Sequence, residues 1–256
     1  MSIGLEGATT DSPREFFIDL GDGNLESFKT SVSYIPSEPN IKVTKKGYGP
    51  VSIYLPENEL ITALAVKDIY ITTIDVTKAS SLRELSLVNT QIYSIDLSWN
   101  KTLRTLNLSG NNLYSLTLAG INEIYTKTML HTINLSKNNL TDLTLNSSFA
   151  IHNLDISNNS LAGIDFSDFD YIETLNIANN KFESIDLTHC TALQSLNISG
   201  KSISSIILPE ENNIKSFNCA NNKFTLETLP QRWAIDEANY IYAPQSDYVI
   251  ATKGPG

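Results

Sequence analysis

A period of 21 residues runs through most of this 256-residue chain and restricts it to a fold made of stacked, nearly identical units. Eight copies begin at residues 61, 82, 103, 130, 151, 172, 193 and 214, and six of the seven intervals are 21 residues long. The copies share apolar residues at positions 1, 4, 6, 11, 14 and 16. Because positions 4 and 6 alternate with polar neighbours, they predict a short strand with one buried face.

A single copy cannot bury its apolar side chains, so we expect successive copies to stack as the coils of a solenoid. Their strands would lie side by side, about 4.8 Å apart, in one parallel sheet. A coil of this length leaves little room for a long helix on its return side, where we expect short strands, turns or 3₁₀ segments. The repeat therefore predicts a mostly β, right-handed solenoid of eight coils.

Asparagine is unusually frequent, with 26 residues, and the repeat places many of them in two columns. Five occupy position 5 of the strand, and position 9, where the chain leaves the sheet, is Asn in five copies. An amide at position 9 can bond backbone groups of its own turn and of the neighbouring coil, so we expect an asparagine ladder. Thr90 can make part of these bonds. Lys201 cannot accept them, so the turn at Gly200 and Lys201 should differ. The ladder residues are Asn111, Asn138, Asn159, Asn180 and Asn222.

The pattern LxxLxLxxNxLxxLxL, complete in residues 103–118, resembles the leucine-rich repeat. The Asp before the last apolar position, as in Ile95-Asp96-Leu97, is similar to the short bacterial class called IRREKO. The resemblance covers about 170 of the 256 residues. It implies a binding module whose usual contact surface is the concave face of the parallel sheet.

The segments outside the repeat are expected to cap the two ends of the solenoid. We predict a β cap in residues 1–60, the solenoid in 61–229, and a C-terminal cap with a linker in 230–256. The last β-like run of the N-terminal cap should join the repeat sheet, and Trp233, Tyr240 and Tyr242 should close the last coil. A Gly-Asp-Gly hairpin is predicted between the first two of four β-like runs, at 16–19, 27–32, 41–44 and 51–55.

The flanking segments resemble those of leucine-rich repeat surface proteins from Bacteroidetes-type gut bacteria. A Gly-Asp-Gly-bearing β segment precedes the repeats there, and a Tyr-x-Tyr-Ala-Pro-Gln segment, here residues 240–245, follows them. The resemblance implies an outer-membrane lipoprotein exposed on the cell surface, in glycan uptake or host contact. The first seven residues show neither the basic nor the apolar region of an export signal.

Composition and motifs exclude several classes of function. The net charge of −10 argues against nucleic acid as a partner, and no apolar run is long enough to span a bilayer. Catalytic signatures such as GxSxG, HExxH and the P-loop are missing, so we expect no enzyme and no cofactor. His131 and His152 share position 2 and should be neighbours, but no further ligand accompanies them, so we expect no metal. Cys190 and Cys219 read as buried apolar residues.

A possible cation site and a possible ligand surface each have a purely structural alternative. Asp19 and Asp22 in the hairpin could bind a cation, but a turn is the simpler interpretation. The concave face of the parallel sheet, called here its outer face because it points away from the core, is small and polar. It could bind a glycan or peptide or simply hydrogen-bond along the sheet. Its candidate ligand-binding residues are Thr105, Asn107, Thr132, Asn134, Asn153, Asp155, Thr174, Asn176 and Asn197.

Aromatic residues gather elsewhere and form a second set of candidate partner-binding residues. Tyr93 and Tyr114 share position 12 of adjacent coils, and Trp99 occupies position 18 of the second coil. The single 27-residue interval adds six residues near 120–128, which contain Ile124 and Tyr125. An insertion of this kind often forms a binding loop, so Trp99, Ile124 and Tyr125 are the best localised contact candidates, and Tyr93 and Tyr114 are further candidates on an outer face. The alternative is that the loop merely covers Trp99.

These observations favour a non-catalytic binding module that engages a protein or a glycan and is a monomer or one subunit of a surface complex. The alternative is a rigid spacer that presents another module of a surface assembly. A further domain after Gly256 in the full-length protein would favour the spacer.

Overall fold

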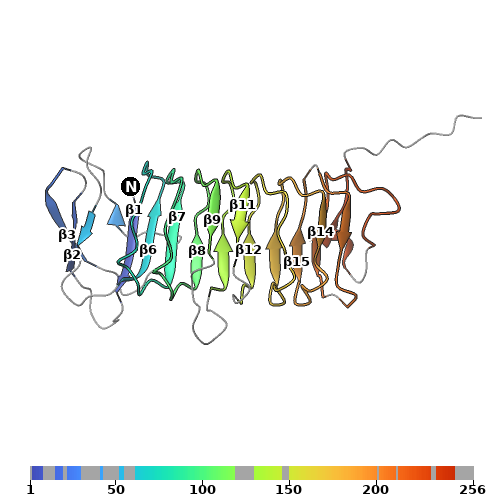
Figure 1. Cartoon of the computed structure of the whole chain (residues 1–256), viewed down its shortest axis with the longest axis horizontal. Helices are drawn as coiled ribbons and strands as arrows, with labels where there is room; N and C mark the ends of the chain where they lie inside the picture. Colours follow the sequence, from blue (N-terminus) through green and yellow to red (C-terminus); the bar gives the residue numbers. More distant parts are fainter. Residues whose placement is uncertain are drawn as a thin grey trace, which may run out of the picture.

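The structure is a computed structural model, and it forms a row of stacked coils along the long axis of the molecule (Figure 1). Strands account for nearly all of its regular structure. The predicted solenoid is therefore confirmed. The structure describes residues 2–7, 15–19, 22–29, 41–42, 52–54, 61–118, 130–145, 150–200, 202–211, 213–231 and 235–245.

One strand from each of the eight coils pairs in parallel with the strand of the next coil. Residues at the same repeat position lie opposite each other, for example Leu106 opposite Ile133. Equal positions therefore form straight columns across the sheet. These strands are β6 (Ile61–Lys67), β7 (Glu84–Val88), β8 (Thr105–Asn107), β10 (Thr132–Asn134), β12 (Asn153–Asp155), β13 (Thr174–Asn176), β15 (Ser195–Asn197) and β17 (Ser216–Asn218).

Strands on the return side of the coils also pair with each other, in addition to the single parallel sheet that the repeat predicts. β9 (Ser115–Thr117) pairs in parallel with β11 (Asp142–Thr144). β14 (Ser184–Asp186) pairs in the same way with β16 (Ser205–Ile207). These strands span positions 13 to 15, so each of these coils has one strand on the main sheet and one on the return side.

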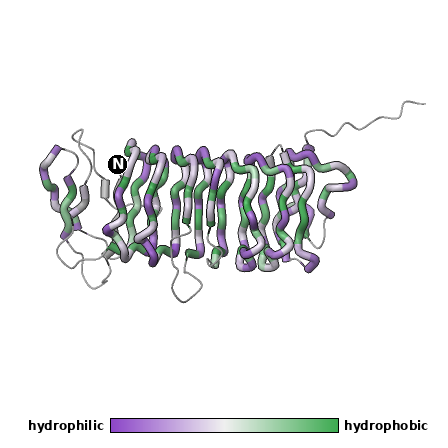
Figure 2. The backbone as a smooth tube through the Cα atoms, in the orientation of Figure 1, coloured by the Kyte–Doolittle hydropathy of each residue, from purple (hydrophilic) through white to green (hydrophobic). Residues whose placement is uncertain are grey.

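The core is the narrow space between the main sheet and the return side. Strand positions 4 and 6 point into it, and Leu85, Leu106 and Leu135 are completely buried. Apolar stretches recur along every coil in the hydropathy-coloured tube (Figure 2). Since each side chain packs between its own coil and the next, stacking buries the apolar set that a lone copy would expose.

The N-terminal segment does form a small antiparallel sheet, but its connection to the solenoid differs from the prediction. β2 (Glu15–Asp19) pairs with β3 (Leu25–Lys29) in the predicted hairpin. β5 (Ser52–Tyr54), expected to join the repeat sheet, pairs with β2 instead. The joining strand is β1 (Ser2–Gly7), which runs antiparallel to β6. β4 (Ile41–Lys42) adds one more antiparallel strand beyond β1.

The hairpin turn holds its own carboxylates. Asp19 Oδ1 accepts the backbone N–H groups of Asp22 and Gly23, at 3.2 and 3.0 Å. Asp22 Oδ1 accepts the N–H of Asn24 at 3.0 Å. Gly23 has a φ of 81°, which a glycine adopts without strain. These bonds favour the turn interpretation over a cation site.

The last coil is closed by a half-coil at the C-terminal end. After the 3₁₀ helix η1 (Glu237–Asn239), β18 (Tyr240–Ile241) pairs in parallel with β17. The Tyr240 ring packs 5.7 Å from the ring of Phe217, and Tyr242 stacks on Tyr240 at 5.6 Å. Both tyrosines therefore close the last coil as predicted, while Trp233 lies outside the described residues.

Gln245 completes this cap by standing in for a ladder asparagine. Its Oε1 accepts the N–H groups of Asn222 and Phe224, at 3.2 and 3.4 Å, and its Nε2 donates to Cys219 O at 3.1 Å. Asn111 makes the same three bonds to its preceding coil: its Oδ1 accepts the N–H groups of Thr90 and Ile92, and its Nδ2 donates to Leu87 O. The longer glutamine side chain thus closes the ladder after the eighth coil.

Candidate functional site

The asparagine ladder is confirmed as the element that holds the upper edge of the coils. This edge comprises the turns after the main-sheet strands, at repeat positions 7 to 12 (Figure 1). Asn138 Nδ2 donates to Leu108 O of the preceding coil and to Leu135 O of its own, at 2.9 and 3.0 Å. Asn138 Oδ1 accepts the N–H of Leu113 at 3.1 Å. The turn thereby satisfies backbone groups that are buried away from water. Equivalent bonds are made by Asn111, Asn159, Asn180 and Asn222.

Position 8 forms a third column, which the sequence analysis missed. The residue there has a left-handed φ between 53° and 70° in seven coils. Its N–H donates to the backbone carbonyl of position 7 in the next coil, or to Pro244 O in the case of Asn221. Asparagine tolerates this conformation better than most residues, which gives four more asparagines a structural role. The signal was visible as a column of Asn, Asp, Gly and Lys. Its members are Asp68, Asn89, Gly110, Lys137, Asn158, Asn179 and Asn221.

The seventh coil departs from this pattern, as expected for the turn before Lys201. Gly200 lacks the left-handed φ of its column, although its N–H still reaches Ala220 O at 3.2 Å. Lys201 itself lies outside the described residues. The predicted difference is therefore visible in the backbone of the preceding residue.

The outer face of the main sheet holds the predicted ligand-binding residues in two adjacent columns, at positions 3 and 5. Position 5 has a structural task in every coil from the third onward. Asn107 Oδ1, for example, accepts the N–H of Ser109 at 3.1 Å. Such bonds to the residue two positions on close the end of each strand. The same bond is made by Asn134, Asp155, Asn176, Asn197 and Asn218.

The nitrogens of these amides and the position 3 side chains remain on the outer surface. Among the described residues, Nδ2 of Asn107, Asn134 and Asn197 has no hydrogen-bond partner. Two side-chain bonds cross between strands: Asn176 Nδ2 donates to Asp155 Oδ2 at 3.2 Å, and Asn153 Nδ2 donates to Thr132 Oγ1 at 3.5 Å. From Thr105 to Asn197 the face is thus an array of amide donors and hydroxyls that contains one carboxylate, Asp155, and Thr105, Thr132 and Thr174 share one column. The structure brings all nine predicted residues together.

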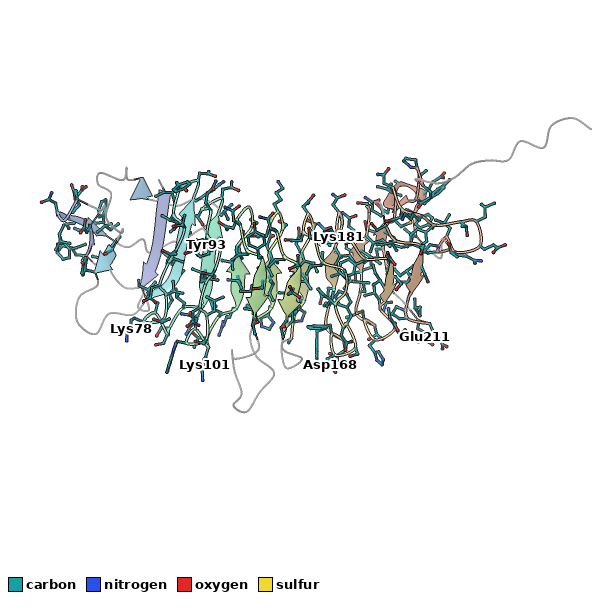
Figure 3. All side chains as sticks on the ribbon, turned by 45° about the horizontal axis from the view of Figure 1, so that its top comes forward. Lys78, Tyr93, Lys101, Asp168, Lys181 and Glu211 are labelled. Atoms are coloured by element: carbon teal, nitrogen blue, oxygen red, sulfur yellow. The ribbon has the colours of Figure 1, made fainter. Side chains whose placement is uncertain are left out.

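The predicted aromatic residues, in contrast, lie at two different edges of the solenoid. Tyr93 and Tyr114 lie at the upper edge, before the return strands, and are 52% and 63% exposed. Trp99 lies at the lower edge, which comprises positions 17 to 21 of one coil and positions 1 and 2 of the next. Figure 3 shows Tyr93 apart from Lys78 and Lys101, which flank Trp99 in sequence along that lower edge. One partner-binding site cannot be centred on both sets.

Trp99 is 62% exposed. The insertion that the alternative would place over it lies outside the described residues. Ile124 and Tyr125, predicted beside it, lie outside the described residues. Trp99 therefore remains the localised aromatic candidate of the lower edge.

His131 and His152 are neighbours as predicted, with ring centroids 5.0 Å apart. Tyr171 extends the row, its ring 6.1 Å from that of His152. His131 Nδ1 lies 3.0 Å from Ala150 O, so this nitrogen carries the hydrogen and donates it. In the described part of the chain, no group of three or more His, Cys, Asp or Glu side chains is placed to hold a metal ion.

The aspartates of position 15 each close a turn. Hydrogen bonds from Thr77 hold the pKa of Asp75 below its ordinary value. The same side-chain and backbone bonds, from residues two positions on, lower the pKa of Asp96, Asp165 and Asp186. These carboxylates therefore stay ionised and occupied by their own turns.

The two cysteines are buried in different columns and are poor nucleophiles. Burial raises the pKa of Cys190 to about 12 and that of Cys219 to about 11.

We therefore expect no reaction of these cysteines with Ellman's reagent near pH 8 in the folded protein. After denaturation both thiols should react and release thionitrobenzoate. Thionitrobenzoate absorbance measures both states. Fast release from the folded chain would contradict the buried placement.

Comparison with known proteins supports the class that this geometry defines. A leucine-rich repeat family model matches residues 102–123. The functional domain of InlJ from Listeria monocytogenes is similar with a TM-score of 0.61 and 25% identity, over 71% of this chain and 39% of that one. A leucine-rich repeat protein of Leptospira interrogans is similar with a TM-score of 0.52 and 22% identity, over 61% of this chain and 42% of that one. The comparison with curated proteins gives no match.

The chain is a parallel β-solenoid held by an asparagine ladder. Its repeat and its structural neighbours are those of a leucine-rich repeat protein. It spans well under half the length of either neighbour. The InlJ domain includes a cysteine ladder, whereas Cys190 and Cys219 here lie in separate columns and asparagine forms the ladder. In the described residues, no helix is long and apolar enough to cross a bilayer.

Proposed function

We propose that this chain is a non-catalytic binding module whose outer main-sheet face engages a protein or a glycan. The observation that carries this proposal is the even array of hydroxyls and amide donors in the columns of Thr132 and Asn134. Strand register sets the spacing of these groups, so the face is rigid before any ligand arrives. A preorganised polar face loses little conformational entropy on binding.

The cellular setting is part of the same proposal. The flanking segments support a bacterial surface protein of the Bacteroidetes type, with a lipid anchor at the outer membrane and a role in glycan uptake or host contact. The acidic charge and the regular fold also suit a rigid spacer. The two roles differ in whether the outer face makes contacts.

Replacing Thr174 with arginine tests the face directly. Thr174 is exposed in β13 and does not close a turn, so the bulky charged side chain blocks the face while leaving the fold intact. We expect capture of partners from the cell-surface fraction, or binding on a glycan array, to fall at least tenfold, as for an interface residue costing about 1.4 kcal/mol.

Ser184→Arg is the matched control, because Ser184 is equally exposed at the start of β14 on the return side. It should bind as the unsubstituted protein does. Equal binding by both variants would refute the outer face as the contact surface and favour the spacer. Circular dichroism confirms that each variant is folded.

A further inference from the structure

The lower edge of the first three coils has an unusual set of side chains. In the described part of the chain, the arginines are Arg83 and Arg104 and the tryptophan is Trp99, so all fall within one short stretch. All three are exposed, as are Lys78 and Lys101. We call these five residues the basic edge. Figure 3 labels its two lysines along the lower border of the molecule.

Backbone contacts hold the members of the basic edge side by side. Arg104 N donates to Arg83 O at 2.7 Å, so the two arginines lie side by side, each directly before its main-sheet strand. Under Trp99, the buried Asn100 donates from Nδ2 to Val76 O and Ala79 O of the preceding coil, at 3.0 and 2.8 Å. This anchor places Trp99 next to Lys78, which shares its repeat position.

The charge of this edge is opposite to that of the molecule as a whole. The chain carries −10, and further along the same edge Asp168, Asp170 and Glu173 succeed one another without a Lys or Arg. Among the described residues, the basic edge has four cations and three neighbouring acids. Those acids are Asp75 and Asp96, which accept bonds from Thr77 and Ser98 on the return side, and Glu84 in β7.

We propose that the basic edge is a second contact surface and that its partner is a protein segment with acidic side chains around an apolar anchor. Trp99 provides the apolar contact, and Arg83 and Arg104 pair with carboxylates. Tryptophan and arginine are the residues that carry most binding energy at protein interfaces. Guanidinium groups also bind carboxylates in a two-point geometry that lysine cannot match.

A protein partner fits this surface better than a nucleic acid or a long polyanionic glycan. Such polymers extend past the cations and meet the acidic side chains of the fifth coil on the same edge. Among the described residues, the row of neighbouring cations lies in coils 1 to 3, with His131 and His152 between it and those acids, and Lys215 lies beyond the acids in coil 8. A short acidic segment can pair with the arginines without reaching the repulsive half of the edge.

The test uses two synthetic peptides of equal length, one alternating Glu with Leu and Phe, the other with Gln in place of Glu. Fluorescence anisotropy with the full chain measures both, and polygalacturonate is the polysaccharide probe. We expect the acidic peptide to bind at least tenfold more tightly than the neutral one, and the difference to shrink at high salt. Arg83→Gln with Arg104→Gln should remove this preference. Trp99→Ala should weaken the acidic peptide about 30-fold.

Lys181→Gln with Lys223→Gln is the matched control, because it removes two exposed cations from the upper edge. It should leave both peptides unaffected. No binding, no preference for Glu over Gln, equal loss in the control, or tighter binding of polygalacturonate than of the acidic peptide would each overturn the proposal. Although the inference rests on the proposed binding role, it concerns another surface. Thr174→Arg should leave peptide binding intact, so either proposal can fail alone.

Discussion

Replacing Asn111 with alanine is expected to lower the free energy of unfolding by about 4 kcal/mol. The side chain is only 5% exposed and bonds to Leu87 O, Leu108 O and the N–H groups of Thr90 and Ile92. Leu108 O keeps its bond from Asn138 Nδ2. Alanine would leave Leu87 O and the N–H groups of Thr90 and Ile92 without this buried partner, each at a cost of about 1–3 kcal/mol, partly relieved by water. Urea denaturation followed by circular dichroism measures the change.

Asn112→Ala is the control for this experiment. Asn112 is the next residue, but its side chain is exposed and makes only a long bond of 3.4 Å to Gln91 Oε1. We expect a change within about 0.5 kcal/mol. Similar losses for both substitutions would show that the ladder does not contribute more than any surface amide.

The second large effect is expected from Leu154→Ala in the middle of the solenoid. Leu154 is 1% exposed and lies in β12, at position 4 of its repeat, so alanine leaves a cavity between coils. The expected loss is about 2–5 kcal/mol. Leu226→Ala makes the same chemical change at a side chain that is 78% exposed, and it should cost less than about 0.5 kcal/mol.

The position of Leu154 also predicts how the variant unfolds. Coils contact only their neighbours, so weakening a central coil uncouples the two halves of the stack. We expect hydrogen exchange to accelerate first in coils 4 and 5 and less in the terminal coils. Uniform acceleration along the chain would mean that the solenoid unfolds as one unit despite its linear contacts.

The main-sheet columns could be predicted from sequence because one local rule repeats. Leu106 and Asn138 stand at fixed offsets in their copies, and strands that share a period must align equal positions when they stack. Burial of one face then excludes every other register. Inside the repeat, the position of each side chain therefore followed from its number in the copy.

The N-terminal cap lacked this advantage. Nothing repeats in residues 1–60, so several short β runs compete for the open edge of β6, and pairing is decided by tertiary contacts. Ser2–Gly7, which the sequence pattern did not indicate as a strand, pairs with β6. Ser52–Tyr54 pairs with Glu15–Asp19 instead. Non-local pairing of this kind leaves no periodic trace in the sequence.

The positions of the candidate site residues could be predicted in part. The outer-face residues were placed correctly because their columns follow from the repeat. Tyr93 and Trp99 lie at different edges because positions 12 and 18 stand at opposite ends of the return side of the coil. The basic edge was overlooked because its cations occupy three different repeat positions, and only the stacked turns bring Lys78, Arg83, Lys101 and Arg104 to one edge.

The cap made by Gln245 has a consequence for self-association. Any stack of identical coils is a template on which another molecule could add its own first coil, and repeated addition would give a fibre. At the C-terminal end, Gln245 already occupies the N–H groups of Asn222 and Phe224. At the other end, β1 reverses the strand direction. A fibre would grow only if a further coil could pair in parallel at an end of the stack. The two caps therefore oppose end-to-end addition of a second molecule.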